Sequence, residues 1–274
     1  MCASASNWIE APTFEIDLDQ PAERWFEHAP ERLRERGREL IEAVRAEVPD
    51  DIDTDGLIGR VAGVLLGFLA GRNMAREAEA NAVWLGVSKR EILLGACAYD
   101  LTTRIFACSG ALLPSPRGPV LARNMDFWPD AMLARCSMTT RAVDQSGLRF
   151  LNLGWPGSIG VVTGLSARGF ALSLNAVTHN EVAPIDGYPV TLFLRKVLEE
   201  AESFDDAVAR LEKQRLAAPC LIGVVGVEND ERFIVERTPT KAALRHAKGD
   251  APLVVTNHYI TIKHEAPADH HLET

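Results

Sequence analysis

The sequence predicts an α+β fold in which helices and strands are segregated along the chain. The N-terminal third has helical patterns: a charged helix is expected over Pro30–Glu47, and a capping box of Ser88 and Glu91 opens another helix. After Asp100, short apolar runs alternate with turn residues, and paired helices follow from Pro189. This order favours layered sheets with packed helices over a repeated strand–helix–strand unit. The expected strands are Thr13–Leu18, Arg104–Leu113, Val120–Met125, Ala134–Val143, Arg149–Leu153, Ile159–Leu165, Phe170–Asn175, Leu221–Val227, Arg232–Glu236 and Leu253–Thr256.

Composition places the chain among folded globular proteins of one large domain or two small ones. It has 274 residues, of which 47% are hydrophobic and 24% charged. Acidic residues outnumber basic ones, and the net charge is −9. A protein that binds nucleic acid usually has a basic surplus, so we expect no nucleic-acid partner.

The cysteines and the N-terminus indicate a reducing compartment. Five cysteines are spread over a long chain, which is not the pattern of a disulfide framework. The segment Met1–Glu10 has neither the basic start nor the apolar stretch of a secretory signal. We therefore expect a cytoplasmic protein with free thiols.

The segment Gly59–Gly71 has a glycine at every fourth position, which gives a helix a smooth stripe for close packing. Its apolar run, Val61–Gly71, is shorter than the roughly 20 residues of a membrane span. We interpret the stripe as helix packing inside the protein, and a weak contact with a membrane surface stays open as the alternative.

Several catalytic motifs are missing, including a phosphate-binding glycine loop, CxxC, HExxH and GxSxG. The remaining candidates are Cys108, Arg123, Asp126 and Asn257. A hairpin that turns at Pro114–Gly118 would bring Arg123 and Asp126 back beside Cys108, where a guanidinium favours the thiolate. Taken singly, each residue also has an ordinary structural explanation: a core cysteine, a surface ion pair and a strand terminus.

Three segments together make the chain recognisable. The stretch Glu91–Asp100, continuing through Cys108-Ser-Gly to Ala122–Phe127, resembles the family of acid ceramidase and N-acylethanolamine-hydrolysing acid amidase. The wider kin of that family are the penicillin acyltransferases and choloylglycine hydrolases. Phe14–Trp25 is similar to the start of the family's α subunit, and Val255–Tyr259 is similar to its late asparagine motif. The resemblance covers about residues 12–260.

The resemblance implies an N-terminal nucleophile (Ntn) hydrolase, with a four-layer αββα sandwich and an N-terminal helical α-chain segment. Such proteins cut themselves before the nucleophile, here between Ala107 and Cys108. The products would be a helical N-terminal segment, 1–107, and the Ntn-hydrolase segment, 108–274. The freed α-amine of Cys108 would act as its base, with Arg123 beside the thiolate. Asp126 would hydrogen-bond the α-ammonium, and Asn257 would donate to the oxyanion. No metal or organic cofactor is implied.

The chain departs from the family pattern in two places. Near Asn175, acid ceramidase-like members tend to carry a glutamate; Asn175 is more like the penicillin acyltransferase branch, and we consider it a substrate-binding candidate. No arginine follows Arg245, whereas the family usually has one after the late asparagine. We therefore expect the chain to be C-terminally incomplete relative to its family.

The histidines near the end do not have the spacing of a zinc site. We interpret this group as part of a polar loop or terminus. It consists of His258, His264, His270 and His271.

The expected activity is hydrolysis of a linear amide with an apolar acyl chain, through an acyl-thioester on Cys108. The expected partners are a small-molecule N-acyl amide and the two chains of the cut precursor. Two alternatives stay open: an acyltransferase, in which a second amine accepts the acyl group, and an unprocessed binding protein without catalysis. The sequence does not indicate an oligomeric state.

Overall fold

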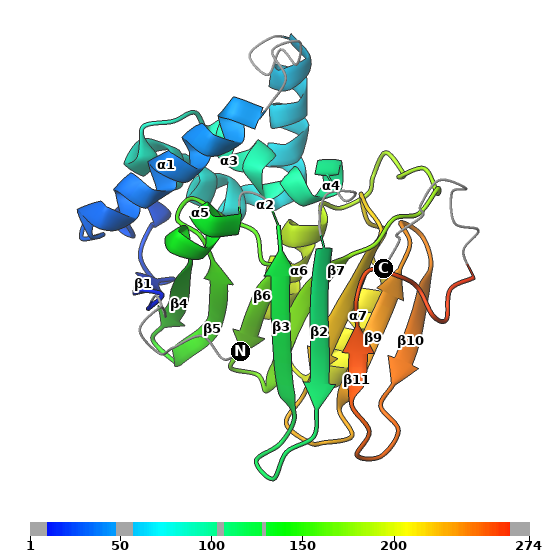
Figure 1. Cartoon of the computed structure of the whole chain (residues 1–274). Helices are drawn as coiled ribbons and strands as arrows, with labels where there is room; N and C mark the ends of the chain where they lie inside the picture. The colour runs from blue at the N-terminus through cyan, green and yellow to red at the C-terminus, as the bar shows by residue number, and fades with distance from the viewer. Residues whose placement is uncertain (1–9, 48–56, 103–106, 128–129, 264–274) are drawn as a thin grey trace. The chain divides into compact units, whose positions relative to one another are not determined.

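The computed structural model describes residues 10–47, 57–102, 107–127 and 130–263, and its helices and strands are labelled in Figure 1. The chain divides into two compact units, each assembled from two segments. Unit 1 comprises Met1–Leu93 and Trp128–Ser158; unit 2 comprises Leu94–Phe127 and Ile159–Thr274. Each unit therefore contains residues from both sides of the Ala107–Cys108 bond. The predicted segments, 1–107 and 108–274, do not coincide with the two compact units.

Unit 1 combines helices with three neighbouring strands. Strand β1 pairs in parallel with β4, with Thr13 opposite Thr139, and β4 forms an antiparallel hairpin with β5. Phe26 stacks between Phe14 and Trp84, at ring-centroid distances of 5.8 and 4.6 Å. The elements are β1 (Thr13–Asp17), the 3₁₀ helix η2 (Ala22–Arg24), α1 (Glu31–Glu47), α2 (Leu57–Leu85), α3 (Lys89–Ala96, whose end enters unit 2), α5 (Asp130–Cys136), β4 (Met138–Asp144) and β5 (Gly147–Gly154).

Local sequence signals explain most of these boundaries. The predicted capping box is confirmed: the Ser88 N–H donates to Glu91 Oε2 at 2.8 Å, and the Glu91 N–H donates to Ser88 Oγ at 3.3 Å. The predicted strand Ala134–Val143 is wrong in its first part, because α5 continues to Cys136 and β4 begins at Met138. The run from Ala131 to Cys136 is rich in strong helix formers, and that preference outweighs its apolar character.

Helix α2 contains the glycine-striped segment and a kink. Gly71 has φ 77° and ψ 171°, so two helices meet there. The side chains of residues 57–70, which carry the predicted lipid or packing stripe, lie outside the described residues. Within the part of the chain that the structure describes, no helix is both long and apolar enough to cross a membrane.

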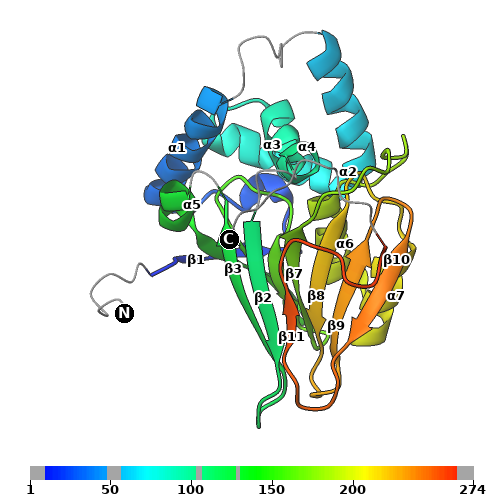
Figure 2. The same cartoon turned by 45° about the vertical axis from the view of Figure 1, so that its right-hand side comes forward.

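Unit 2 contains two stacked sheets. One sheet has the strand order β11-β2-β3, and the other has the order β6-β7-β8-β9-β10 with antiparallel neighbours. The views of Figures 1 and 2 agree that β2, β3 and β11 lie against one face of the larger sheet, with α6 (Val190–Glu200) and α7 (Phe204–Lys213) behind its other face. The strands are β2 (Ala107–Leu113), β3 (Val120–Asp126), β6 (Thr163–Ser166), β7 (Phe170–Ala176), β8 (Cys220–Val225), β9 (Arg232–Arg237), β10 (Ala242–His246) and β11 (Leu253–Val255).

The core of unit 2 lies between its two sheets. A cluster of buried side chains from both sheets fills this space, and Leu112 of β2 and Leu221 of β8 are both fully buried in it. Together with the outer helices, this gives three layers, helix on sheet on sheet, within the unit. The predicted α+β layering is thus confirmed for unit 2.

The helices of unit 2 are α4 (Ala98–Thr102), α6 (Val190–Glu200) and α7 (Phe204–Lys213). As predicted, Ser203 begins α7, and its side chain accepts a hydrogen bond from the Asp206 N–H at 3.2 Å. The predicted strand Arg104–Leu113 appears as β2 from Ala107, and residues 103–106 lie outside the described residues.

The segment before the expected cut is fastened to the chain after it. Asp100 Oδ1 accepts the Val190 N–H at the start of α6 at 3.0 Å, and the Tyr99 hydroxyl donates to the Pro219 carbonyl at 2.8 Å. Asp100 Oδ2 is buried without a hydrogen-bond partner among the described residues. Burial raises the pKa of Asp100 from 3.8 to about 7, although the Val190 N–H opposes this by stabilising the carboxylate.

Asp100→Asn should stabilise the protein increasingly as pH rises from about 4 to 7. The unfolded chain loses the Asp100 proton near its ordinary pKa while the folded chain keeps it, so wild-type stability falls across this window. Asparagine does not titrate and keeps the acceptor for Val190. The difference in unfolding free energy should grow to at most about 4 kcal/mol. Urea denaturation at several pH values measures it, and a pH-independent difference would refute the assignment.

Candidate active site

The β2–β3 hairpin brings the first two candidate residues together. Cys108 lies opposite Met125, and Gly110 lies opposite Arg123. The Cys108 thiol is buried, with 4% of the residue exposed. Arg123 Nη2 lies 3.5 Å from Cys108 Sγ, so the hairpin predicted from the sequence does carry the guanidinium to the thiol.

The turn of this hairpin requires its glycine. Gly118 has φ 97°, and a Cβ there would lie 2.6 Å from the Val227 carbonyl oxygen. Only glycine adopts this backbone conformation in such a confined place without strain. Gly118 therefore helps to fix the register that sets Arg123 beside Cys108.

The Arg123 guanidinium is held from the larger sheet. Nη1 donates to Thr163 Oγ1 of β6 at 3.1 Å, and Nη2 donates to the Leu174 carbonyl of β7 at 2.6 Å. Burial lowers the pKa of Arg123, and the neighbouring Cys108 thiol acts in the opposite direction. The arrangement fixes a cationic group between the sheets, next to the sulfur.

Asn257 reaches the same cysteine from β11. This strand pairs with β2, with Val255 opposite Gly110, and Asn257 follows it by two residues. Asn257 Oδ1 accepts the Cys108 N–H at 3.0 Å, and Nδ2 donates to the Ala176 carbonyl at 2.7 Å. Because a backbone N–H only donates and a carbonyl only accepts, the two contacts fix the orientation of the amide.

Asn175 of β7 contacts the segment that leads from β11 to Asn257. It is fully buried near the end of β7, and its Nδ2 donates to the Thr256 carbonyl at 3.3 Å. Its Oδ1 is buried without a hydrogen-bond partner among the described residues. Asn175 therefore fastens the segment that carries Asn257, and its contact with substrate stays a prediction.

Asp126 is the candidate that the structure does not bring to the thiol. It lies opposite Ala107 on the exposed face of β3, whereas Arg123 lies on the inner face. Alternation of side chains along a strand separates residues three apart in this way. Asp126 Oδ1 accepts from Asn124 Nδ2 at 2.8 Å. Its predicted role toward a free α-amine concerns the cut chain, in which the Cys108 nitrogen is no longer part of a peptide bond.

The described residues hold no group of three or more His, Cys, Asp or Glu side chains suited to a metal ion. His258 is exposed, and its Nδ1 lies 2.8 Å from Thr256 Oγ1. His264, His270 and His271 lie outside the described residues.

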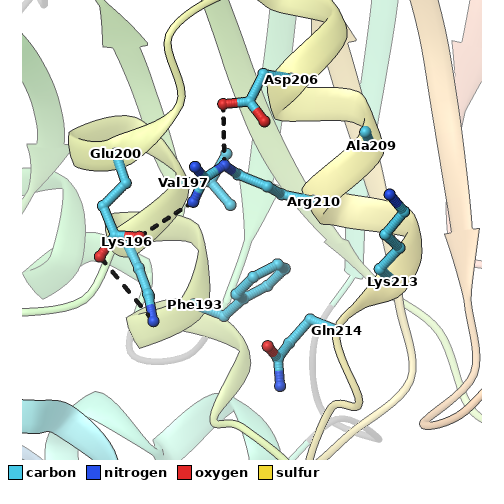
Figure 3. A pocket seen from close by; sticks show the side chains of 9 residues that line it. All are labelled: Phe193, Lys196, Val197, Glu200, Asp206, Ala209, Arg210, Lys213 and Gln214. Atoms are coloured by element: carbon cyan, nitrogen blue, oxygen red, sulfur yellow. Dashed lines mark hydrogen bonds and ion pairs between the residues drawn. The ribbon is translucent and has the colours of Figure 1, made fainter.

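A separate groove of about 290 Å³ lies between α6 and α7 (Figure 3). Its charged side chains pair with one another: Arg210 contacts both Asp206 and Glu200. The residues that line it include no cysteine, serine or histidine, so the candidate chemistry stays with Cys108.

A match to the model of a known protein family shows the family of this chain. The family model described as acyl-coenzyme A:6-aminopenicillanic acid acyl-transferase matches residues 114–274, more than half of the chain. The chain belongs to this family. The match includes Arg123, Asp126, Asn175 and Asn257 and begins after Cys108.

Curated relatives extend the similarity across the cysteine. The N-acylethanolamine-hydrolyzing acid amidase of Oryctolagus cuniculus is 27% identical over 261 residues, which cover 90% of this chain and 71% of that protein. The Mus musculus protein of the same name is 24% identical, with 84% of this chain and 66% of the relative covered. The chain thus spans about two thirds of the length of these relatives. A solved structure of the Caenorhabditis elegans ortholog of N-acylethanolamine-hydrolyzing acid amidase is 23% identical to this chain in sequence, with a TM-score of 0.49. The match covers 55% of this chain and 70% of that one.

The groups that hold Arg123 and Asn257 in place were not predicted from the sequence. Thr163 lies in a run predicted only as a strand, and its sequence context carries no catalytic motif. The carbonyls of Leu174 and Ala176 are backbone groups, which any residue type supplies. Their part in the site depends on the tertiary fold, which places β7 against Arg123 and Asn257.

Thr163→Val should slow alkylation of Cys108 by iodoacetamide at neutral pH by several-fold. Valine keeps the shape of threonine but removes the acceptor of Arg123 Nη1, which loosens the positively charged group that lies 3.5 Å from the sulfur. Peptide mapping by mass spectrometry resolves Cys108 from the other thiols. Thr140→Val, on β4 of unit 1, is the matched control, and equal rates in both variants would contradict the assignment.

Proposed function

We propose that this chain is a cysteine amidase that cuts itself between Ala107 and Cys108 and then hydrolyses the linear amide of an apolar acyl group. The observation that carries the proposal is the 3.5 Å contact between Arg123 Nη2 and Cys108 Sγ, in a chain whose Cys108 N–H is also held by Asn257. The family of the chain and the amidases among its relatives support amide chemistry.

Self-cleavage begins with the thiol of Cys108. The sulfur attacks the Ala107 carbonyl carbon, the carbon–nitrogen bond breaks, and the nitrogen takes up the thiol proton to become the α-amine. Water then attacks the thioester, which releases the Ala107 carboxylate and restores the thiol. Asn257 Oδ1 supports this step because it already holds the nitrogen that becomes the amine.

Turnover uses the new amine as the base. It accepts the thiol proton, and the thiolate attacks the carbonyl carbon of the substrate. The carbon–nitrogen bond of the substrate breaks as the ammonium returns the proton to the leaving amine. Water hydrolyses the acyl-thioester, again with the α-amine as base, and the acid leaves.

Asn257 supplies the oxyanion donor in this mechanism. Its Nδ2 carries two hydrogens, and the Ala176 carbonyl accepts one of them. The second serves the negatively charged oxygen of the tetrahedral intermediate. Asp126, one strand position beyond Met125, holds the α-ammonium after the cut, when the amine is no longer confined by Ala107.

The substrate class follows from the relatives. They are named for hydrolysis of N-acylethanolamines, so N-acyl amides of that type, with acyl chains of graded length, are the first substrates to test. The acyltransferase alternative has its own support in the description of the family model. A competing amine in the assay separates the two, because a transferase forms a new amide while a hydrolase forms only free acid.

Intact-mass measurement should detect two chains, 1–107 and 108–274, that stay associated without denaturant. Cys108→Ala should remain one chain and lose amide hydrolysis, because both steps need the sulfur. Cys108→Ser should cut itself slowly and turn over poorly, since a hydroxyl performs the same shift but is the weaker nucleophile. Cys136→Ala, which replaces a buried thiol in unit 1, is the control and should behave like wild type.

Two outcomes would contradict the proposal. An intact wild-type chain that hydrolyses amides would exclude the α-amine as base. A single band at all pH values, with no activity, would favour the unprocessed binding protein.

A further inference from the structure

A buried carboxylate outside the proposed chemistry binds the chain just after Asn257. Glu236 of β9 is fully buried, with 0% exposed. Its Oε1 accepts the N–H of Ile260, and its Oε2 accepts those of Thr261 and Ile262, each at 2.9 Å. Hydrogen bonds to a charged acceptor are about twice as strong as neutral ones, so three consecutive amides are held firmly.

The partner of this carboxylate holds the chain just before Asn257. Arg245 Nε of β10 lies 2.8 Å from Glu236 Oε1, and Arg245 Nη1 donates to the Val254 carbonyl of β11 at 3.1 Å. Val254 precedes Asn257 by three residues, and Ile260 follows it by three. One ion pair therefore contacts the backbone on both sides of the asparagine.

Two further contacts hold the chain between Val254 and Ile260: the Asn175 bond to the Thr256 carbonyl described above and the side chain of Tyr259. The Tyr259 hydroxyl donates to the Arg237 carbonyl at 2.7 Å, and the Tyr259 ring meets the His179 ring edge-on at 5.7 Å between centroids. Asn257 lies between these anchors with its side chain turned to Cys108 and Ala176. An error in backbone position of about 1 Å at such a group typically costs up to about a hundredfold in rate.

We propose that the Glu236–Arg245 pair is a positioning device that holds Asn257 against the Cys108 nitrogen. The expected effect on catalysis rests on the proposed function, whereas the expected effect on the backbone around Asn257 does not. Glu236 and Arg245 act through Asn257 and do not touch the sulfur.

Hydrogen exchange of the full-length protein tests the structural part. Glu236→Gln keeps the shape of the side chain and removes its charge. Amides of residues 260–262 should exchange at least about tenfold faster than in wild type, because they lose a charged acceptor. Unchanged exchange there would overturn the proposal, whether or not the protein is an amidase.

Glu231→Gln is the matched control for this variant. Glu231 Oε2 likewise accepts two backbone amides, those of Val227 and Glu228 at 2.7 and 2.9 Å, in the β8–β9 turn. That turn lies at the opposite end of β9 from Glu236. Glu231→Gln should accelerate exchange only in its own turn and leave self-cleavage and turnover unchanged.

Kinetics of the processed enzyme test the catalytic part. Glu236→Gln should lower kcat at least tenfold with little change in KM. Asn257 would be displaced from the reacting carbonyl, while the substrate would still bind. In an Asn257→Ala background, the same substitution should have almost no further effect. An equal fall in both backgrounds would overturn the proposal, since the effect would then bypass Asn257.

A second variant covers the case in which Glu236→Gln does not fold. Arg245→Lys leaves Glu236 charged and removes the donor to Val254, so exchange should rise in residues 253–256 and kcat should fall by a smaller factor. No change in either would overturn the proposal. If the wild type neither cuts itself nor hydrolyses amides, the proposed function fails, and hydrogen exchange alone decides whether the pair positions Asn257.

Discussion

The buried guanidinium of Arg123 is the constraint on which the candidate site depends. Burying a cation between two sheets is costly unless it is hydrogen-bonded. Nη1 and Nη2 of Arg123 contact groups on three strands, Cys108 on β2, Thr163 on β6 and Leu174 on β7, while Nε is buried without a hydrogen-bond partner among the described residues. A slip of one residue in the β2–β3 pairing would turn Arg123 to the outer face, because side chains alternate along a strand. The observed register of the hairpin therefore places the guanidinium both beside the thiol and against the larger sheet.

The second organising feature is that each compact unit is built from chain on both sides of Cys108. In unit 1, β1 is paired along its whole length with β4. In unit 2, Asp100 and Tyr99 bind backbone groups that lie after the cysteine. The uncut chain therefore assembles the site first, and the same contacts would hold the two products of a cut together. Asp100 does this at an energetic cost, because its carboxyl is buried with one oxygen unpaired.

Periodicity, capping and turn residues predicted the α+β layering, most strands of unit 2 and the helix that begins at Ser203. They failed at α5, where apolar residues suited either structure, and at β10, which was not predicted. Ala242–His246 has little β-branched character and becomes a strand because β9 offers it a partner. For the candidate site, resemblance and spacing predicted Cys108, Arg123 and Asn257, and the structure brings these three residues into contact. The supports at Thr163, Glu236 and Arg245 lie on other strands, and only the tertiary pairing reveals them. Asp126 was expected beside the cysteine, but strand alternation directs it to the other face of the uncut chain.

In the proposed reaction, the sulfur of Cys108 carries the acyl group during turnover, on a chain that begins with this residue. Rapid acid quenching of wild-type protein with an excess of N-acyl amide, followed by mass spectrometry, tests it most directly. Fragment 108–274 should gain the mass of one acyl group, the added group should lie on Cys108, and hydroxylamine should remove it as it does a thioester. Turnover without an acylated fragment, or with the acyl group on another residue, would exclude Cys108 as the nucleophile.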